Sequence, residues 1–119
     1  MTGQEMFEKA LKLLSYTEPD GSSDSSLVMR ALSIINAVYA DIFFIFENEG
    51  FTPLYSLSDE IGLPERVLRD VMPYGVAMHL ALGEGDGLNE QVFATLYNSK
   101  RASLGPETRR GDVIPSIYE

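Results

Sequence analysis

The sequence of 119 residues contains no cysteine, no tryptophan and a single histidine. Without cysteine, the chain has no disulfide framework, no thiolate nucleophile and no cysteine-ligated zinc site. The histidine, His79, lies between Met78 and Leu80, and no serine is set in the glycine pattern of a nucleophile elbow. Neither redox chemistry nor a Ser-His-Asp relay is indicated, and a packed or surface histidine explains His79.

Positive charge is also scarce. The chain has 9 Lys and Arg against 18 Asp and Glu, which gives a formal net charge of −9 and a pI near 4.5. Contacts to phosphates need clustered Lys and Arg, so a free-standing nucleic-acid binder is not expected. The exception lies at the end of the chain, where residues 100–119 contain Lys100, Arg101, Arg109 and Arg110.

Long apolar runs are absent as well. No segment approaches the ~20 uninterrupted apolar residues that span a bilayer, and the first residues lack the basic start and apolar run of a signal peptide. A content of 45% hydrophobic and 23% charged residues is that of an ordinary globular protein. We therefore expect one helical domain at residues 1–104, without a membrane segment, followed by an extended C-terminal arm at residues 105–119.

Helical periodicity begins near the start of the chain. Thr2 and Glu5 have the spacing of a capping box, and apolar residues at helical spacing then predict a first helix at 3–16. Residues 17–26, TEPDGSSDSS, consist of turn-forming residues and predict a loop.

The last part of the domain shows three further helical patterns. Pro64 suits a helix start and Pro73 interrupts the pattern, which predicts a helix at 64–71 and a continuation at 73–82 that is either kinked or separate. After the loop Gly83–Gly87, a final helix is predicted at 88–103, with its buried stripe formed by Leu88, Val92, Phe93, Leu96 and Tyr97.

The longest pattern predicts a helix at 26–49 that forms the spine of the domain. Its apolar residues cover about half of the circumference, which is wider than a surface helix needs. The remaining half carries a strip of small residues together with one large apolar one: Ser33, Ala37, Ala40 and Phe44. This strip is explained either by contact with another helix of the same chain or by a subunit interface. A β-strand at 42–46 is the alternative for its aromatic end.

Two clusters of acidic and amide side chains are candidates for a chemical site. Glu84, Asp86, Asn89 and Glu90 surround a glycine loop, but Leu88 stands where a calcium loop needs an oxygen ligand, so helix capping by Asp86 explains the group better. Asp59 and Glu60 are adjacent, and adjacent side chains rarely point at a common atom. No phosphate-binding glycine loop is present. We therefore expect no metal, no cofactor and no enzymatic activity.

The basic and apolar residues after the domain form a candidate docking arm. Its basic residues are suited to an acidic partner surface, and its apolar residues are suited to a groove or sheet edge of a neighbour. The alternative is that Lys100 and Arg101 complement the dipole of the last helix, with a solvated tail behind them. The residues proposed for the arm are Arg109, Arg110, Val113, Ile114, Ile117 and Tyr118.

Several segments together resemble the head-tail adaptor, or connector, proteins of tailed bacteriophages. They are an opening Leu-Pro-Glu at 63–65, the run of Tyr74, Gly75 and Ala77, the Gly-Asp turn at 83–87, and a closing Leu-Tyr-x-x-Lys-Arg at 96–101. The earlier ALSIINAVYADI at 31–42, placed between a polar turn and a connector, agrees in order. The resemblance covers about residues 1–104 and contains no single diagnostic motif.

This resemblance implies an all-α bundle of four to five helices with a long central helix and no enzymatic activity. Such proteins assemble as a homo-oligomeric ring beneath the portal protein, extend the DNA conduit and receive the tail or a stopper protein. The implied location is the virion head-tail junction, with assembly in the cytoplasm of the bacterial host, and DNA is only a non-specific passenger. The short connector at 50–62 and the brief tail depart from relatives. The alternative is a small acidic regulatory or interaction module of a bacterial cell.

Overall fold

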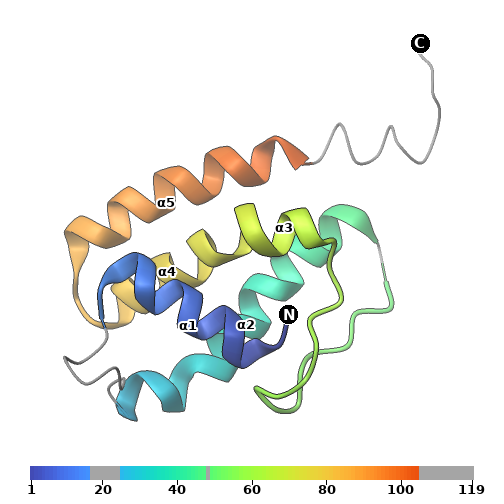
Figure 1. The fold of residues 1–119 in the computed structure, drawn as a ribbon. Helices are drawn as coiled ribbons and strands as arrows, with labels where there is room; N and C mark the ends of the chain where they lie inside the picture. The colour runs from blue at the N-terminus through green and yellow to red at the C-terminus, as the bar shows by residue number, and fades with distance from the viewer. Residues whose placement is uncertain (17–24, 48, 105–119) are drawn as a thin grey trace.

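A computed structural model describes residues 1–16, 25–47 and 49–104. Within these ranges the chain forms five helices and no strand, so the predicted all-α fold is confirmed (Figure 1). The helices are α1 (Gly3–Leu14), α2 (Ser25–Phe46), α3 (Glu65–Asp70), α4 (Met72–Gly83) and α5 (Gly87–Ala102). The proposed arm, with Arg109, Arg110, Val113, Ile114, Ile117 and Tyr118, and the loop residues 17–24 lie outside the described residues.

Helix α1 begins as its sequence predicts. The Thr2 side chain accepts a hydrogen bond from the Glu5 amide at 3.1 Å, and the Glu5 carboxylate accepts one from the Thr2 amide at 2.9 Å. This reciprocal pair satisfies two donors that a helix start otherwise leaves free. The helix ends at Leu14 rather than Tyr16, because Ser15 takes the left-handed conformation with φ 60°. One face of α1 is buried: Gly3, Met6, Phe7, Ala10, Leu11 and Leu14.

Helix α2 is the longest and remains helical through residues 42–46, so the strand alternative is wrong. It ends at Phe46, three residues before the predicted end at 49. The reason is aromatic packing: the Phe51 ring lies 5.0 Å from the Tyr39 ring and 5.4 Å from the Phe43 ring, between centroids. Since apolar rings gain energy from such contacts, the chain leaves the helix early enough for Phe51 to return onto it.

The connector between α2 and α3 is fastened by hydrogen bonds to α2 and to the N-terminus. The Asn36 side chain donates to the Leu54 carbonyl at 2.9 Å and accepts from the Leu54 amide at 2.8 Å. At the other end, the Ile61 amide donates to the Met1 carbonyl at 2.9 Å. Leu54 is buried, whereas the neighbouring Tyr55 is 80% exposed.

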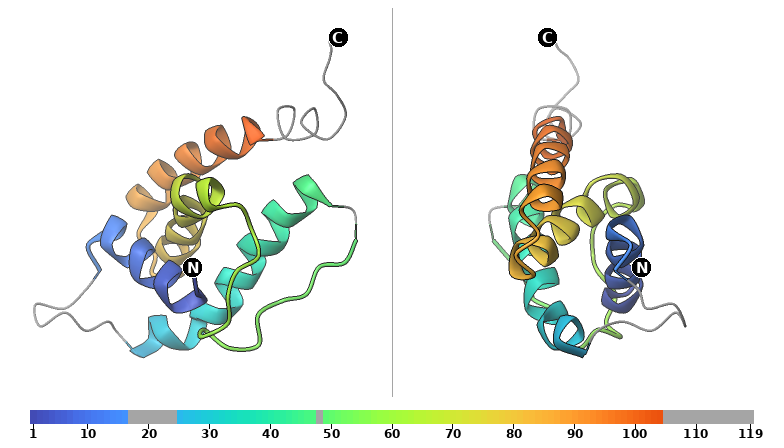
Figure 2. Two further views of the ribbon diagram at one scale, coloured as in Figure 1. Left: turned by 45° about the vertical axis from the view of Figure 1, so that its right-hand side comes forward. Right: turned by 90° about the vertical axis from the view of Figure 1, so that its left-hand side faces the viewer.

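Helices α3 and α4 are separate, which is one of the two arrangements that the interruption at Pro73 predicts. Pro64 is the N-cap of α3, and Pro73 lies in the first turn of α4, where its missing amide costs no helical hydrogen bond. Helix α4 is apolar on all sides and contacts each of the other four helices. Figure 2 shows it between α1 and α2, with α5 lying along it. The longest helix, α2, therefore packs on one side of the bundle, and α4 occupies its middle.

The run of Tyr74, Gly75 and Ala77 marks the joint between α4 and α5. A Cβ at Gly75 would lie only 2.7 Å from the nearest Tyr97 ring atom, so the absent side chain lets that ring pack against the α4 backbone. Tyr74 packs on the Phe93 ring at 6.1 Å, and the Lys100 ammonium lies 4.7 Å from the centroid of the Tyr74 ring. These contacts hold α5 along α4.

One helix in the described part of the chain is long and apolar enough to cross a membrane by length and composition. It is Leu27–Phe46 within α2, with a mean hydropathy of 1.6. This segment is not an uninterrupted apolar run, because Arg30 and Asp41 lie within it. Both charges pair with other helices, Arg30 with Glu84 and Asp41 with Arg101. Core helices pass the same test, and α2 contributes six buried residues to the core: Leu27, Ala31, Ile35, Val38, Tyr39 and Ile42.

Candidate protein interaction surface

The carboxylates around the α4–α5 loop serve structural contacts. The Arg30 guanidinium donates to Glu84 at 2.5 Å, and the Tyr16 hydroxyl donates to Asp86 at 2.5 Å. Asp86 also caps α5, since its side chain accepts from the Asn89 amide at 3.3 Å, as the sequence predicts. The Tyr16 and Asn89 hydrogen bonds lower the pKa of the Asp86 carboxyl. No group of three or more His, Asp and Glu side chains is arranged to hold a metal within residues 1–16, 25–47 and 49–104.

The adjacent pair Asp59 and Glu60 diverges, as expected for neighbours in sequence. The Asp59 carboxylate accepts from the amides of Tyr55 and Ser56, at 2.8 and 3.0 Å, and so closes a turn. The Glu60 carboxylate instead accepts from the N-terminal ammonium at 3.0 Å. Both carboxylates shape the connector and do not converge on one site.

The strip predicted on α2 lies on the outer side of the helix. Ser33 and Ala37 are exposed, Ala40 is half-buried, and Phe44 is 46% exposed. Phe44 is therefore not covered by another helix in the described part of the chain. One edge of its ring contacts Phe43 and Phe51, with centroids 5.6 and 5.9 Å away, so these contacts restrict the position of the exposed ring.

An open groove with a volume of about 610 Å³ lies between α2 and the C-terminal end of α5. Three of the four predicted strip residues line it, and Ser33 does not. Three of its seven lining residues are alanines, and Phe44 and Ile45 supply its larger apolar groups. We call it the α2/α5 groove, lined by Ala37, Ala40, Asp41, Phe44, Ile45, Arg101 and Ala102.

A polar network joins the two sides of this groove. The Arg101 guanidinium donates to both oxygens of Asp41, at 2.7 and 3.1 Å, and the Tyr97 hydroxyl donates to the same carboxylate at 2.6 Å. Burial raises the pKa of the Tyr97 hydroxyl well above its ordinary value, and the bond to Asp41 raises it further. Donation to Asp41 also raises the pKa of Arg101. The groove therefore contains one ion pair whose charges are already matched.

Helix α5 is exposed where the sequence predicts burial. Of its predicted buried stripe, only Phe93 and Tyr97 are buried, with 8% and 3% exposure. Leu88, Val92 and Leu96 are 77%, 46% and 38% exposed, so the prediction is wrong for these three. Their spacing of four residues places them in one row along the helix. We call this row the α5 ridge.

The ridge and the groove occupy different flanks of α5. Arg101 and Ala102 line the groove toward α2. Lys100 and Ser103, which share a helical face with Leu96, line a smaller hollow of about 200 Å³ toward α3, together with Arg66 and Asp70. The ridge therefore runs along the α3 side of α5, and the groove opens on the α2 side.

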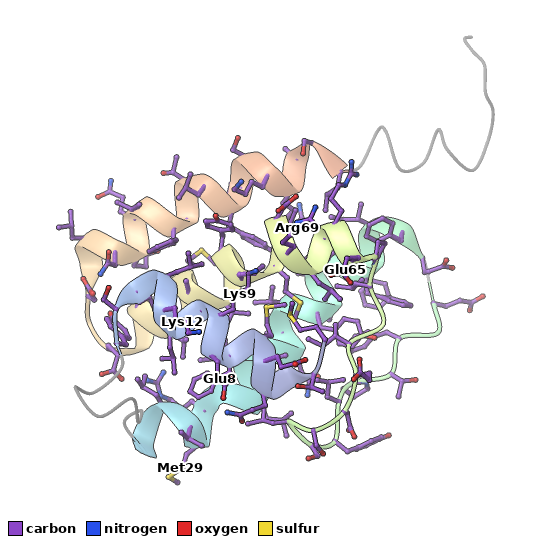
Figure 3. All side chains as sticks on the ribbon, viewed as in Figure 1. Glu8, Lys9, Lys12, Met29, Glu65 and Arg69 are labelled. Carbon is purple, nitrogen blue, oxygen red and sulfur yellow. The ribbon has the colours of Figure 1, made fainter. Side chains whose placement is uncertain are left out.

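Charge is distributed unevenly over the helices. The three charged residues of α5, Glu90, Lys100 and Arg101, are all half-buried, and each of its fully exposed residues is uncharged. On α2, the two charged residues, Arg30 and Asp41, are both ion-paired. Helices α1 and α3 instead expose charged side chains, and Figure 3 labels five charged residues of these two helices, Glu8, Lys9, Lys12, Glu65 and Arg69. Exposed α2 and α5 positions thus form a surface almost free of charge in a chain of net charge −9.

No known protein family matches this chain, and comparison with curated proteins and with solved structures also gave no significant match.

Proposed function

We propose that this protein is a non-enzymatic structural subunit of a phage or prophage head-tail connector, which assembles as a homo-oligomeric ring beneath the portal and joins the tail. The exposed, nearly uncharged surface of α2 and α5, with the α2/α5 groove at its centre, is the observation that carries the proposal. Exposed apolar residues grouped on one surface are typical of protein association sites. The order of helices and the segments that resemble phage adaptors supply the specific assembly.

The acidic character of the remaining surface is compatible with this role. A ring that extends a DNA conduit must let the phosphate backbone pass without binding it. Carboxylates repel phosphates, so an acidic lining favours sliding over adhesion. The portal and the tail or stopper protein are the further partners that the proposal requires, and the chain needs no cofactor to bind them.

Analytical ultracentrifugation of the wild type and two aspartate variants tests the self-association. Phe44→Asp places a carboxylate in the groove, and Tyr55→Asp replaces a more exposed aromatic residue of the connector as a control. We expect the wild type and Tyr55→Asp to form the same closed oligomer and Phe44→Asp to remain a folded monomer by circular dichroism. A wild type that stays monomeric at high concentration and does not bind the portal protein of the same genome would contradict the proposal.

The second candidate is a small acidic interaction or regulatory module of a bacterial cell. The same uncharged surface favours it, since a different protein partner can bind there as readily as a second copy. The gene neighbourhood separates the two functions: portal, terminase or tail genes beside this one support the connector, and their absence supports the regulator.

A further inference from the structure

We infer that the α5 ridge of one copy of this chain packs into the α2/α5 groove of a second copy, in a head-to-tail contact. The inference rests on the proposed self-assembly and names the two surfaces that make it. The ridge consists of Leu88, Val92 and Leu96, and the groove has Ala37, Ala40 and Phe44 along its α2 side.

The two surfaces match in length and in relief. At 1.5 Å per residue, Leu88 to Leu96 extends over about 12 Å and Ala37 to Phe44 over about 10 Å. A row of residues four apart forms a ridge on a helix, and such a ridge packs into a hollow of matching shape, here the one between α2 and α5. Ala37, Ala40 and Ala102 allow the close approach that leucine and valine side chains need for contact.

Charge favours a second copy as the occupant. Two chains of net charge −9 repel one another, so a stable contact between copies must lie where neither presents unpaired charge. The ridge has no charged residue, and its exposed neighbours on α5, such as Gln91, Thr95 and Ser99, are uncharged too. In the groove, Asp41 and Arg101 already neutralise each other, so an apolar ridge covers the pair without leaving a single charge buried alone.

The arrangement also determines the type of assembly. Because ridge and groove lie on different flanks of α5, a copy that offers its ridge to one neighbour still offers its groove to another. Such a heterologous contact produces a ring if the rotation between copies closes and a filament if it does not. A two-fold contact of groove with groove would instead stop at a dimer.

Cysteine cross-linking tests this pairing, since the natural chain has no cysteine. Separate full-length chains with Ala37→Cys and Val92→Cys are mixed and oxidised, and Tyr55→Cys mixed with Val92→Cys is the control. A disulfide forms only when the two Cβ atoms approach to about 4 Å, so we expect about tenfold more Ala37–Val92 heterodimer than control heterodimer. A chain with both cysteines should give a ladder of covalent multimers.

Other results assign the groove to another occupant and overturn the pairing. Homodimers of Ala37→Cys in excess over heterodimers indicate groove on groove. Cross-linking of Ala37→Cys to Ile117→Cys, in excess over Val92→Cys, indicates the C-terminal segment. If the wild type forms oligomers by ultracentrifugation but the heterodimer does not exceed the control, the pairing fails and the proposed ring survives. If neither oligomers nor cross-links form, the pairing fails, and the proposed ring fails with it when the chain also does not bind the portal protein of the same genome.

Discussion

The side of the bundle formed by α1 and α3 differs from the side formed by α2 and α5 in the exposure of its charged residues. Helices α1 and α3 expose Lys, Arg, Asp and Glu, as surface helices commonly do, and their apolar residues other than Leu13 face the core. The charged residues of α2 are ion-paired and those of α5 are half-buried, and both helices expose serine, threonine, alanine, glutamine and apolar side chains instead. Both sides rest on the same central helix, α4.

This difference is not a requirement of the fold. A lysine or glutamate at Ala37, Gln91 or Thr95 would extend into solvent and keep the helical propensity high. The monomer therefore gains nothing from excluding charge at these positions. A partner that covers these positions binds more tightly when they are uncharged, because each buried unpaired charge costs free energy. The scarcity of unpaired charge among the exposed residues of α2 and α5 is therefore consistent with the interface proposed for these helices.

The uncharged side exists as a surface only if α5 is held along α4. Gly75 lies at the contact between these two helices, so a larger side chain there should have the largest effect. In Gly75→Val, the added Cβ meets the Tyr97 ring at under 3 Å, and that ring cannot shift without loosening its hydrogen bond to Asp41. We expect a loss of about 2 kcal/mol or more in the free energy of unfolding, measured by urea denaturation. Gly87→Val is the matched control, since an added Cβ there meets no atom within 4 Å; it should change stability by less than about 0.5 kcal/mol. Equal losses in the two variants would show that Gly75 is not a packing constraint.

Alkaline pH should lower the free energy of unfolding, because ionisation of Tyr97 weakens the contact between α4 and α5. Its pKa is raised in the folded protein, so the stabilisation is complete below the unfolded pKa near 10 and is lost as the pH rises above it. For a ring with 3% exposure, the loss at pH 11 is about 1.4 kcal/mol. Urea midpoints at pH 8 to 11 should fall less steeply for Tyr97→Phe than for the wild type. The pKa of Tyr16 is raised to about 12, so part of the fall should remain in the variant. Parallel curves for wild type and variant would contradict the role of Tyr97.

Local features of the fold could be predicted from the sequence because their causes are local. The capping box of Thr2 and Glu5 and the Asp86 cap of α5 depend on residues three apart, and both form as predicted. The exposure of Phe44 follows from its place opposite the wide apolar face of α2. The end of α2 was missed, because it depends on Phe51 returning from the connector.

The candidate site was predicted in part. Helical spacing places Leu88, Val92, Phe93, Leu96 and Tyr97 on one broad face, but spacing alone cannot tell which portion of that face α4 covers. Only Phe93 and Tyr97 meet α4 closely enough to be buried. The contact of Asp41 with Tyr97 and Arg101 was missed altogether, since it joins residues 56 and 60 positions apart. Non-local contacts of this kind leave no periodic signal in the sequence.

The dependence of self-association on salt concentration tests the difference between the two sides without a mutation. If copies associate through uncharged surfaces, the charges elsewhere contribute only repulsion between chains of net charge −9. Raising the salt concentration from about 0.05 to about 0.5 M screens this repulsion and should strengthen association a few-fold in ultracentrifugation. An association held by ion pairs would respond in the opposite direction, so weaker oligomers at high salt would contradict the assignment of the interface to α2 and α5.

The smallest effect is expected on the charged side, at the ion pair between the N-terminal ammonium and Glu60. Glu60 is 74% exposed in this pair, and exposed ion pairs gain little because water and salt screen both charges. Glu60→Gln should lower stability by less than about 0.5 kcal/mol, since the backbone hydrogen bond from Ile61 to Met1 is unaffected.

The raised pKa of the ammonium makes the contribution of this ion pair to stability depend on pH. The contribution is present below the unfolded pKa of 8.0 and is lost as the pH rises above it, and this pH dependence should be missing from the variant. Denaturation at pH 7 and pH 9.5 measures both. A loss above about 1 kcal/mol at pH 7 would mean that this pair stabilises the fold more than an exposed ion pair normally does. The smaller loss would mean that the connector is held to the N-terminus mainly by the backbone hydrogen bond and by packing rather than by these two charges.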